Sequence, residues 1–410
     1  GIIMRTKGLV CRCCGSSDVR LVLDLGKQAW GNDYKKIILD DECEKYPLEL
    51  FFCNNCVMTQ IGYTVPKTEM FLDHTYLSGT TKSLKDHFVD IGSSIMKKIK
   101  FNHGDYILDI GGNDGTFLEF FKENEIKVLN IDSGVLQATI SNSKGIFCIN
   151  DFFNSKIAED ILSEHGQSMV IHGSGIFFHL EELHSVFEGV KLLLGPNGIL
   201  VAEYIYLPSM IKNCAYDQIY HEHLIFFSLI SLQNLLDQFD LEVFDAELKS
   251  IHGGSCISYI SHKNHIPITK RCLDLTEKEY ENGFHKINTY IRFKHKVEKN
   301  KQKLISIISE LKRQGKSIQA LGAPVKGSTI INYCKLTLNE IDCGVEINPY
   351  KCDTYFPGTK IPVYNEKDTL EPDVYLLLAW NFKDEILPKF NSFREKGGKI
   401  LIPIPEPEFI

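Results

Sequence analysis

The run Tyr220-His221-Glu222-His223 places a phenol, two imidazoles and a carboxylate within four consecutive residues. A histidine side chain titrates near neutral pH and can act as a base, while a tyrosine hydroxyl can donate to a developing oxyanion. In a helical turn Tyr220 and His223 would share one face, which suits a base beside a phenol; in an extended run His221 would pair with His223, which suits a metal. We expect acid–base chemistry here, with a metal site or a purely structural polar cluster as the alternatives.

A cofactor loop is expected upstream, within residues 106–121. A short apolar run contains Asp109, Gly111 and Gly115 follow it, and an apolar-periodic segment comes next. This order predicts a strand, a glycine turn and a helix, in which the backbone approaches a ligand closely and the helix N-terminus faces it. The next predicted strand ends in Asp132, where a carboxylate can accept both ribose hydroxyls.

The cofactor is expected to be S-adenosylmethionine and not a nicotinamide dinucleotide. The spacing from Asp109 to Gly115 is D-x-G-x-x-x-G, which is typical of methyltransferases, whereas a dinucleotide site generally uses G-x-G-x-x-G. Asp151 and Phe152 follow where methyltransferases often set an acid and an aromatic ring around adenine. A Rossmann-like domain with an empty site is the alternative. Further strands up to residue 204 predict an α/β doubly wound sheet.

Methylation of carbon explains why a base would follow the last cofactor strand. A sulfonium methyl group needs a carbon nucleophile, which forms when a proton next to a ketone is removed and the enolate is stabilised. A histidine of the run and Tyr220 could take these two roles, while Glu222 could orient the histidine. The Asp/Asn-Pro-Pro-aromatic loop of nucleobase N-methylation is missing from the chain, as is the Pro-Cys loop of pyrimidine methylation.

Six of the thirteen cysteines lie within the first 56 residues, which requires a local cause. Two C-x2-C units, Cys11 with Cys14 and Cys53 with Cys56, predict a closed structural zinc site of four thiolates. Cys13 and Cys43 are alternative ligands, and redox or unligated cysteines are the alternative to zinc. The metal would hold together a segment of about 70 residues that is too small for a large core of its own.

The bulk composition excludes several classes of protein. A length of 410 residues predicts two or three domains. No uninterrupted apolar run of about 18 residues and no signal-peptide pattern occurs, so we expect a soluble, cytoplasmic protein without a membrane partner. The net charge of −8 would repel a phosphate backbone, so no nucleic acid partner is expected. A monomer is favoured over an oligomer.

The C-terminal third predicts a long helix followed by a second sheet. Apolar spacing among many basic residues over 283–315 indicates an amphipathic helix with a solvated charged face. A strand and glycine turn follow over 317–329, but no lysine follows the second glycine as in a phosphate loop, so ATP hydrolysis is not expected. Further strands up to residue 403 predict a second Rossmann-like sheet, with Gly322 and Lys326 near the nucleotide part of a substrate.

Motifs along nearly the whole chain resemble those of the deoxysugar C-3-methyltransferases, which build branched-chain sugars. The principal motifs are Cys11-x-x-Cys14, Cys53-x-x-Cys56, Asp73-His-Thr-Tyr76-Leu-Ser78, Leu108-Asp-Ile-Gly-Gly-Asn-Asp-Gly-Thr116, Tyr220-His-Glu-His223, His252-Gly-Gly-Ser255, Gly322-Ala-Pro324 and Trp380-Asn-Phe382. The resemblance implies a zinc-binding head, a domain that binds S-adenosylmethionine, and a C-terminal Rossmann-like domain, with a nucleotide-linked keto sugar between them. It implies methylation of the carbon next to the ketone through an enolate.

The resemblance also assigns roles to single residues. His223 is expected to be the general base, Tyr220, Glu222 and Tyr76 to line the reaction site, and Ser78 to lie near the methionine part of the donor. The full set of candidates is His223, Tyr220, Glu222, Tyr76 and His179 for catalysis; Tyr76, Ser78, Asp109, Gly111, Asn113, Asp114, Gly115, Thr116, Asp132, Asp151 and Phe152 for the donor; and Cys11, Cys14, Cys53 and Cys56 for zinc.

The chain departs from the family where the family usually has Ala-Asn-Asn, because Gly173-Ser174-Gly175 stands there. Glycine cannot replace the hydrogen bond of an amide thought to approach the sugar. The departure keeps open a different sugar, an epimerase or a methyltransferase acting on another keto substrate. A non-catalytic, zinc-stabilised binding protein is the alternative from another class. The expected domains are 1–72 for zinc, 73–250 for the donor and 251–410 for the C-terminal unit.

Overall fold

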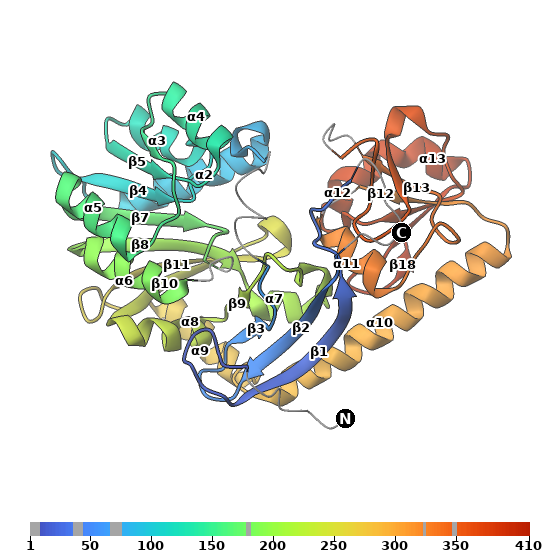
Figure 1. Ribbon diagram of the computed structural model, residues 1–410, viewed down its shortest axis with the longest axis horizontal. Coiled ribbons are helices and arrows are strands. Elements are labelled where there is room, and N and C mark those ends of the chain that lie inside the picture. Colours follow the sequence, from blue (N-terminus) through green and yellow to red (C-terminus); the bar gives the residue numbers. More distant parts are fainter. Residues whose placement is uncertain (1–8, 36–43, 66–75, 178–181, 323–324, 347–350) are drawn as a thin grey trace.

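The computed structural model describes residues 9–35, 44–65, 76–177, 182–322, 325–346 and 351–410. Within these residues the chain forms one four-stranded sheet and two seven-stranded sheets. Figure 1 shows the two larger sheets in separate bodies, with β1 (Val19–Gln28) and β2 (Tyr46–Cys53) running between them and the long α10 (Ile287–Arg313) crossing from one body to the other. No described helix combines the length and the apolar character that crossing a membrane requires.

The four-stranded sheet is antiparallel and has the order β1-β2-β3-β9. Its third strand, β3, spans Thr59–Ile61. Its last strand, β9 (Ile225–Phe226), comes from much later in the chain and lies directly after Tyr220-His221-Glu222-His223. The sheet that starts in the cysteine-rich segment is therefore completed by the segment that carries the candidate base.

The first seven-stranded sheet confirms the α/β doubly wound prediction, with the order β10-β11-β8-β7-β4-β5-β6. Strands β4 to β8 are parallel, while β10 and β11 add an antiparallel edge. Its strands are β4 (Tyr106–Ile110), β5 (Lys127–Ile131), β6 (Cys148–Ile149), β7 (Ser168–Ser174), β8 (Leu194–Ile205), β10 (Leu241–Lys249) and β11 (Ser255–His262).

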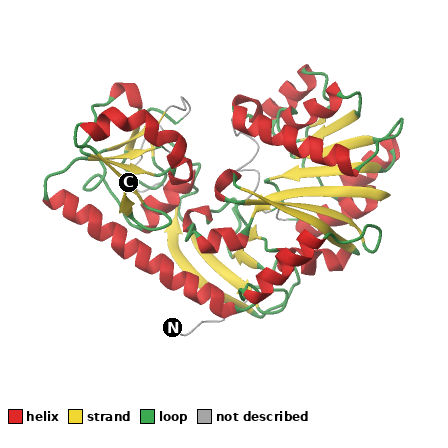
Figure 2. Ribbon diagram, turned by 180° about the vertical axis from the view of Figure 1, so that it is seen from behind, coloured by secondary structure: helices red, strands yellow, loops and turns green. Residues whose placement is uncertain are grey.

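Helices cover both faces of this sheet because alternate strand residues point to opposite sides. Ile107 and Val170 pack with α2 and α3, whereas the next residues, Leu108 and Ile171, pack with α5 and α6. Figure 2 shows the helices on either side of the strands. The helices of this part are α2 (Lys82–Lys98), α3 (Thr116–Glu123), α4 (Val135–Ser143), α5 (Ser155–His165), α6 (Leu183–Leu193), α7 (Leu207–Lys212) and α8 (Leu229–Leu236), with the 3-10 turns η1 (Ser78–Thr80), η2 (Tyr216–Gln218), η3 (Asp237–Phe239) and η4 (Ile251–Gly253).

The C-terminal part confirms the predicted helix and the second Rossmann-like sheet. After α9 (Lys270–Glu281), α10 buries Val297, Leu304 and Ile308 and leaves Lys296, Lys299 and Lys303 exposed. The sheet has the order β14-β15-β13-β12-β16-β17-β18, with five parallel central strands. The elements are β12 (Ile318–Leu321), α11 (Val325–Tyr333), β13 (Cys343–Glu346), β14 (Thr354–Tyr355), β15 (Pro362–Asn365), η5 (Glu366–Asp368), β16 (Val374–Leu377), η6 (Trp380–Phe382), α12 (Lys383–Ile386), η7 (Leu387–Phe390), α13 (Asn391–Glu395), β17 (Lys399–Ile402) and β18 (Glu408–Phe409).

The N-terminal sheet shares its core with the two other parts. Phe52 of β2 stacks on Tyr290 of α10 with ring centroids 4.9 Å apart, and one continuous apolar cluster joins β1, β2, α10 and the C-terminal sheet. A second cluster joins the cysteines to the first seven-stranded sheet. The N-terminal segment thus gains stability from burial against both neighbours.

Candidate functional site

Four cysteine sulfurs converge where two tight turns meet. The Sγ atoms of Cys11, Cys14, Cys53 and Cys56 all lie within 4.8 Å of one another. The Cys11 and Cys56 sulfurs are 3.5 Å apart, and those of Cys14 and Cys53 are 3.6 Å apart. Tetrahedral zinc with Zn–S bonds of about 2.3 Å holds its sulfurs roughly 3.8 Å apart, so the spacing fits zinc. Four thiolates complete the tetrahedron, which makes the site structural.

Neighbouring N–H groups point at the sulfurs, as expected around thiolates. Gln60 Nε2 donates to Cys11 Sγ over 3.1 Å, and the backbone N–H of Cys13 donates to the same sulfur over 3.3 Å. Cys13 itself is buried but stands outside the four-sulfur cluster. Its carbonyl accepts from Gln238 Nε2 over 2.8 Å, which fastens the cysteine turn to the first seven-stranded body. The other alternative ligand, Cys43, lies outside the described residues.

We expect Cys53→Ala to remove zinc and Cys13→Ala to leave it in place, because only the first change opens the tetrahedron. Metal content of the purified variants checks this, with about one zinc per chain expected for Cys13→Ala. Thermal unfolding of Cys53→Ala should begin at a lower temperature, since zinc binding contributes to the free energy of folding. Zinc retained by Cys53→Ala and lost from Cys13→Ala would reverse the ligand assignment.

The glycine loop after β4 is shaped by three left-handed residues. Gly111, Asn113 and Gly115 have φ values of +65°, +55° and +85°. This conformation turns the backbone sharply between the strand and α3, and it strongly favours glycine. Asp109 lies beneath the loop, where its Oδ1 is 2.8 Å from His172 Nδ1. Burial raises the pKa of Asp109 above its usual value, while His172 opposes the rise.

Asp132 at the end of β5 holds the loop from the side. Its Oδ2 accepts from the backbone N–H of Asn113 over 2.9 Å, and its Oδ1 accepts from that of Gly134 over 2.8 Å. Asn150 adds a bond to the Asp132 carbonyl over 3.0 Å and so brings the next two residues near. Of these, Asp151 is exposed and Phe152 is half-buried. The predicted contacts of Asp132 with ribose and of Asp151 and Phe152 with adenine stay predictions.

The segment from Tyr76 to Gly79 is hydrogen-bonded to this loop. Asn113 donates from Nδ2 to the Tyr76 carbonyl over 3.1 Å and accepts from the Ser78 N–H over 3.0 Å. Asp114 accepts from the Gly79 N–H over 2.9 Å. The Tyr76 side chain remains 54% exposed, so it is available to a ligand. Asp114 also accepts from Thr116 Oγ1 over 2.5 Å, which gives both residues a positioning task at the start of α3.

The Tyr220-His221-Glu222-His223 run adopts the turn geometry that suits a base beside a phenol. The N–H of His223 donates to the Tyr220 carbonyl over 2.9 Å, and the two rings lie 3.8 Å apart between centroids. His223 Nδ1 lies 2.6 Å from the carbonyl oxygen of Gln218, an acceptor, so Nδ1 carries the proton. In this tautomer Nε2 is the basic nitrogen. His221 points elsewhere, with its Nε2 3.1 Å from the carbonyl of Pro47.

Glu222 is placed so that it titrates near neutral pH. It is 8% exposed and accepts from Trp30 Nε1 over 2.5 Å. Burial raises the pKa of Glu222 to about 7, against the opposing effects of Trp30 and Lys351. Tyr220 behaves differently, because burial raises its pKa well above the usual value and keeps it protonated. The turn therefore combines a protonated phenol, an imidazole whose Nε2 is basic, and a carboxyl group whose charge changes near neutral pH.

Comparison with known proteins matches the three structural parts one by one. The family model "Putative zinc binding domain" covers residues 11–71, "Methyltransferase domain" covers 86–246, and "C-methyltransferase C-terminal domain" covers 250–405. The chain is 29% identical to C-methyltransferase NovU from Streptomyces niveus over 98% of its own length and 96% of that protein. The three parts are those of an S-adenosylmethionine-dependent C-methyltransferase. The chain is an S-adenosylmethionine-dependent enzyme with a structural zinc site.

Two solved structures similar to the C-methyltransferase each cover less than half of its chain. A methyltransferase from Anabaena variabilis is 18% identical, covers 47% of this chain and 89% of its own, and has a TM-score of 0.36. Magnesium protoporphyrin IX methyltransferase from Synechocystis is 10% identical over 46% of this chain and 85% of its own, with a TM-score of 0.33. The assignment as a C-methyltransferase rests on the three family models and on the similarity to NovU.

Several buried polar residues of the C-methyltransferase were missed in the sequence. Glu203 at the end of β8 accepts from His87 Nε2 over 2.7 Å and from Ser174 Oγ over 2.9 Å. Burial alone would raise the pKa of Glu203, but the bonds from His87 and Ser174 bring it below the usual value. Ser174 belongs to the segment that departs from the family. An isolated acid within an apolar strand was the available signal for Glu203. The candidate His179 lies outside the described residues.

Asp217, a further residue missed in the sequence, links the Tyr220-His221-Glu222-His223 turn to the C-terminal part. Asp217, which is fully buried, accepts from Trp380 Nε1 over 2.7 Å. Lys326 at the start of α11 carries the opposing charge, and burial lowers its pKa. Trp380 was noted only as part of a motif, because its partner is 163 residues away in the chain.

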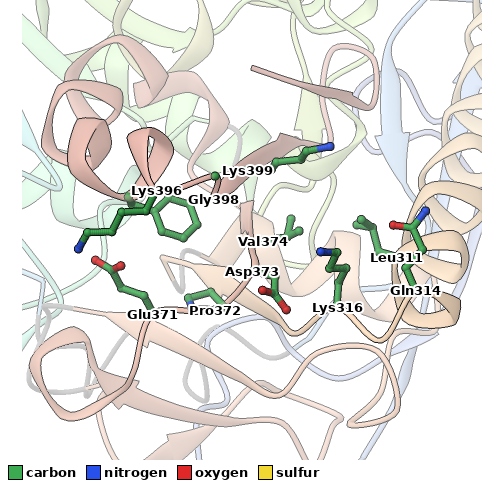
Figure 3. A pocket seen from close by; sticks show the side chains of 12 residues that line it. Leu311, Gln314, Lys316, Glu371, Pro372, Asp373, Val374, Lys396, Gly398 and Lys399 are labelled. Atoms are coloured by element: carbon green, nitrogen blue, oxygen red, sulfur yellow. The ribbon is translucent and has the colours of Figure 1, made fainter.

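A cavity of about 510 Å³ in the C-methyltransferase lies away from all of these residues. It sits at the amino ends of β12, β16 and β17, the opposite edge of the sheet from Trp380. Figure 3 shows charged side chains from several segments around it, among them Lys316, Glu371, Asp373 and Lys396. Since ligands of doubly wound sheets bind outside the carboxyl ends of the strands, this cavity is not assigned to the reaction.

Proposed function

We propose that the enzyme methylates the carbon next to the ketone of a nucleotide-linked keto-deoxysugar. The observation that carries this proposal is the turn in which His223 donates from Nδ1 to the Gln218 carbonyl and its ring lies 3.8 Å from that of Tyr220, tilted by 37°. A base whose proton is fixed on one nitrogen offers the other to a carbon acid. A phenol beside it can donate to the enolate oxygen.

The residues of this chain divide the reaction into two tasks. His223 Nε2 takes the proton from the carbon next to the ketone, and the electron pair of the broken C–H bond forms the enolate. The Tyr220 hydroxyl donates a hydrogen bond to the enolate oxygen and stays protonated because of its raised pKa. Bound S-adenosylmethionine would supply the electrophilic methyl group for the nucleophilic carbon, and S-adenosylhomocysteine would be the leaving group as the bond from sulfur to that methyl breaks. His223 is left protonated and returns its proton to solvent after product release.

Two lysines support a substrate that carries phosphate groups. Lys326 lies in the first turn of α11, directly after β12, and Lys351 lies near Glu222. Burial lowers the pKa of both ammonium groups, so the charged form of each is stabilised when a negative charge approaches it. A diphosphate bound between the carboxyl edges of the two seven-stranded sheets would supply that negative charge. It would place the sugar beside the catalytic turn.

A methyltransferase acting on a different keto substrate is the second candidate, and one observation favours it. Ser174 donates to Glu203, and Gly175 has no side chain. The segment Gly173-Ser174-Gly175 therefore has no side-chain amide that could bind a sugar. An acceptor with another substituent at that position would fit the change better than the usual sugar does.

Incubation with donor that carries an isotopically labelled methyl group tests the proposal. We expect one labelled methyl in the product from a panel of nucleoside-diphosphate keto-deoxysugars, with the label on the carbon next to the ketone. A product whose carbon next to the ketone has exchanged its hydrogen or inverted its configuration, but carries no labelled methyl group, would identify an epimerase. Calorimetry with S-adenosylmethionine serves as the control, since absence of binding at millimolar donor would contradict any transfer activity.

A further inference from the structure

The segment from Tyr216 to Ile219, which leads into the catalytic turn, is held by the C-terminal part. Asp217 Oδ2 accepts from Trp380 Nε1 over 2.7 Å, and Thr329 Oγ1 donates to the Ile219 carbonyl over 2.9 Å. Trp380 follows β16, and Thr329 lies in α11 after β12. These two strands are neighbours in the centre of the C-terminal sheet. Both bonds therefore anchor the segment to one place, the carboxyl edge of that sheet.

Tight packing fixes the two anchors relative to each other. A Cβ atom added to Gly327 would lie 2.8 Å from Leu378 Cδ1, so α11 approaches the end of β16 more closely than any other residue type would allow. Thr329 and Trp380 therefore lie on two closely packed elements. The segment from Tyr216 to Ile219 is bound to these elements at two points.

Burial of the Asp217 carboxylate has a high free-energy cost, which indicates that this residue has a specific role. Its side chain has no exposed surface, and an ionised carboxylate in such surroundings is stable only with compensating partners. Burial raises the pKa of Asp217, while the charge of Lys326 and the Trp380 bond oppose the rise. An apolar side chain would fill the same space without this cost, but it could not accept from Trp380.

Gln218 connects Asp217 to His223 and to His252 of the His252-Gly-Gly-Ser255 motif. Its carbonyl accepts from His223 Nδ1 over 2.6 Å, and its side-chain amide donates to the His252 carbonyl over 3.0 Å. Because Gln218 is the next residue after Asp217, the anchoring of the Asp217 carboxylate by Trp380 restrains the backbone that presents this carbonyl. The carbonyl is what holds the proton of His223 on Nδ1.

We propose that Asp217 is a positioning residue through which Trp380 of the C-terminal part fixes the Nδ1–H tautomer of His223. The inference rests on the role of His223 in the proposed function and adds the reason for a second Rossmann-like domain. The C-terminal part does more than hold the nucleotide, because its carboxyl edge keeps the base in the form that can accept a proton.

The experiment compares Trp380→Phe with Tyr375→Phe in the full-length protein. Phenylalanine at position 380 keeps an aromatic ring but loses the N–H donor. Tyr375 is a buried aromatic residue of the same part that packs against Phe390 and Phe393, away from η2, so Tyr375→Phe is the matched control. Nitrogen-15 spectra of histidine-labelled protein report the tautomer, with His223→Asn used to assign the signals.

In the wild type we expect His223 to be protonated on Nδ1, and in Trp380→Phe we expect a mixture of tautomers. The kcat of Trp380→Phe should fall about 10- to 100-fold, the range for a lost hydrogen bond to a charged group, while KM and donor affinity stay within about threefold. Asp217→Asn, which keeps an oxygen acceptor for Trp380, should preserve the Nδ1–H signal. Tyr375→Phe should match the wild type.

Two results would overturn the inference. One is a wild-type His223 that is protonated mainly on Nε2, a measurement that needs no variant to fold. The other is a folded Trp380→Phe protein with the wild-type spectrum. If no keto sugar is deprotonated or methylated by the wild type, the proposed function fails separately, and the tautomer spectra still decide the role of Asp217.

Discussion

His223→Asn should abolish methyl transfer and the exchange of substrate hydrogen for deuterium while leaving donor affinity unchanged. Asparagine has the approximate size of histidine and can still donate to the Gln218 carbonyl, but it has no nitrogen that accepts a proton near neutral pH. Removal of a general base typically costs about 10²- to 10⁴-fold in rate. Mass spectrometry of the substrate recovered from deuterium oxide measures the exchange step without the donor, and calorimetry measures donor binding.

His221→Asn provides the matched control, since it makes the same change two residues away. His221 faces the carbonyls of Tyr46 and Pro47 and so supports β2 instead of the reaction. We expect the substrate exchange rate of His221→Asn to fall by less than about tenfold. The main effect of this change should be a lower free energy of unfolding. Exchange that survives in His223→Asn at the wild-type rate would remove this residue from the role of base.

Gly112→Ala should weaken donor binding by about 100-fold or more. A Cβ atom at this position would lie 2.0 Å from Asn130 Oδ1 and 2.8 Å from Asp109 Oδ2. Asn130 cannot move aside, because it is fully buried and its Nδ2 donates to the Asn113 carbonyl over 3.0 Å. The loop must shift instead, and displacement of a site by about 1 Å can cost about 10²-fold. Calorimetry with S-adenosylmethionine measures the change.

Gly195→Ala in β8 is the control for the effect of a methyl group on a glycine in the same sheet. Its nearest neighbour would be the Ser168 carbonyl oxygen at 3.4 Å, which is an ordinary contact. We expect Gly195→Ala to bind the donor as the wild type does. Equal affinity in Gly112→Ala and Gly195→Ala would show that the glycine loop does not approach the donor as closely as its shape implies.

Much of the fold followed from local patterns. The glycine loop between residues 106 and 121, the strand ending before Asp132 and the amphipathic helix within 283–315 were all expected, and the structure has β4, β5, α3 and α10 there. Local signals suffice for such elements because backbone preference and hydrophobic periodicity act over a few residues. The paired C-x2-C units also identified four converging sulfurs, since two ligands of each pair come from one turn.

The environment of the catalytic turn could not be predicted in the same way. The sequence left both a helical turn and an extended run open for Tyr220-His221-Glu222-His223, and the bond from His223 to Gln218 accompanies the turn. Glu222 meets Trp30 across 192 residues of chain. No periodic pattern encodes a single hydrogen bond over such a separation.

By itself, the sequence determined which groups are available and on which local elements they stand: a zinc-binding head, a donor loop, and a phenol and base within one turn. Only the tertiary structure decided which of the two histidines presents a basic nitrogen beside Tyr220, and how Asp217 and Trp380 hold it in that state. The reason is physical: residue type fixes the possible chemistry, whereas the tautomer and pKa of a buried group depend on the atoms that burial brings within about 3 Å of it.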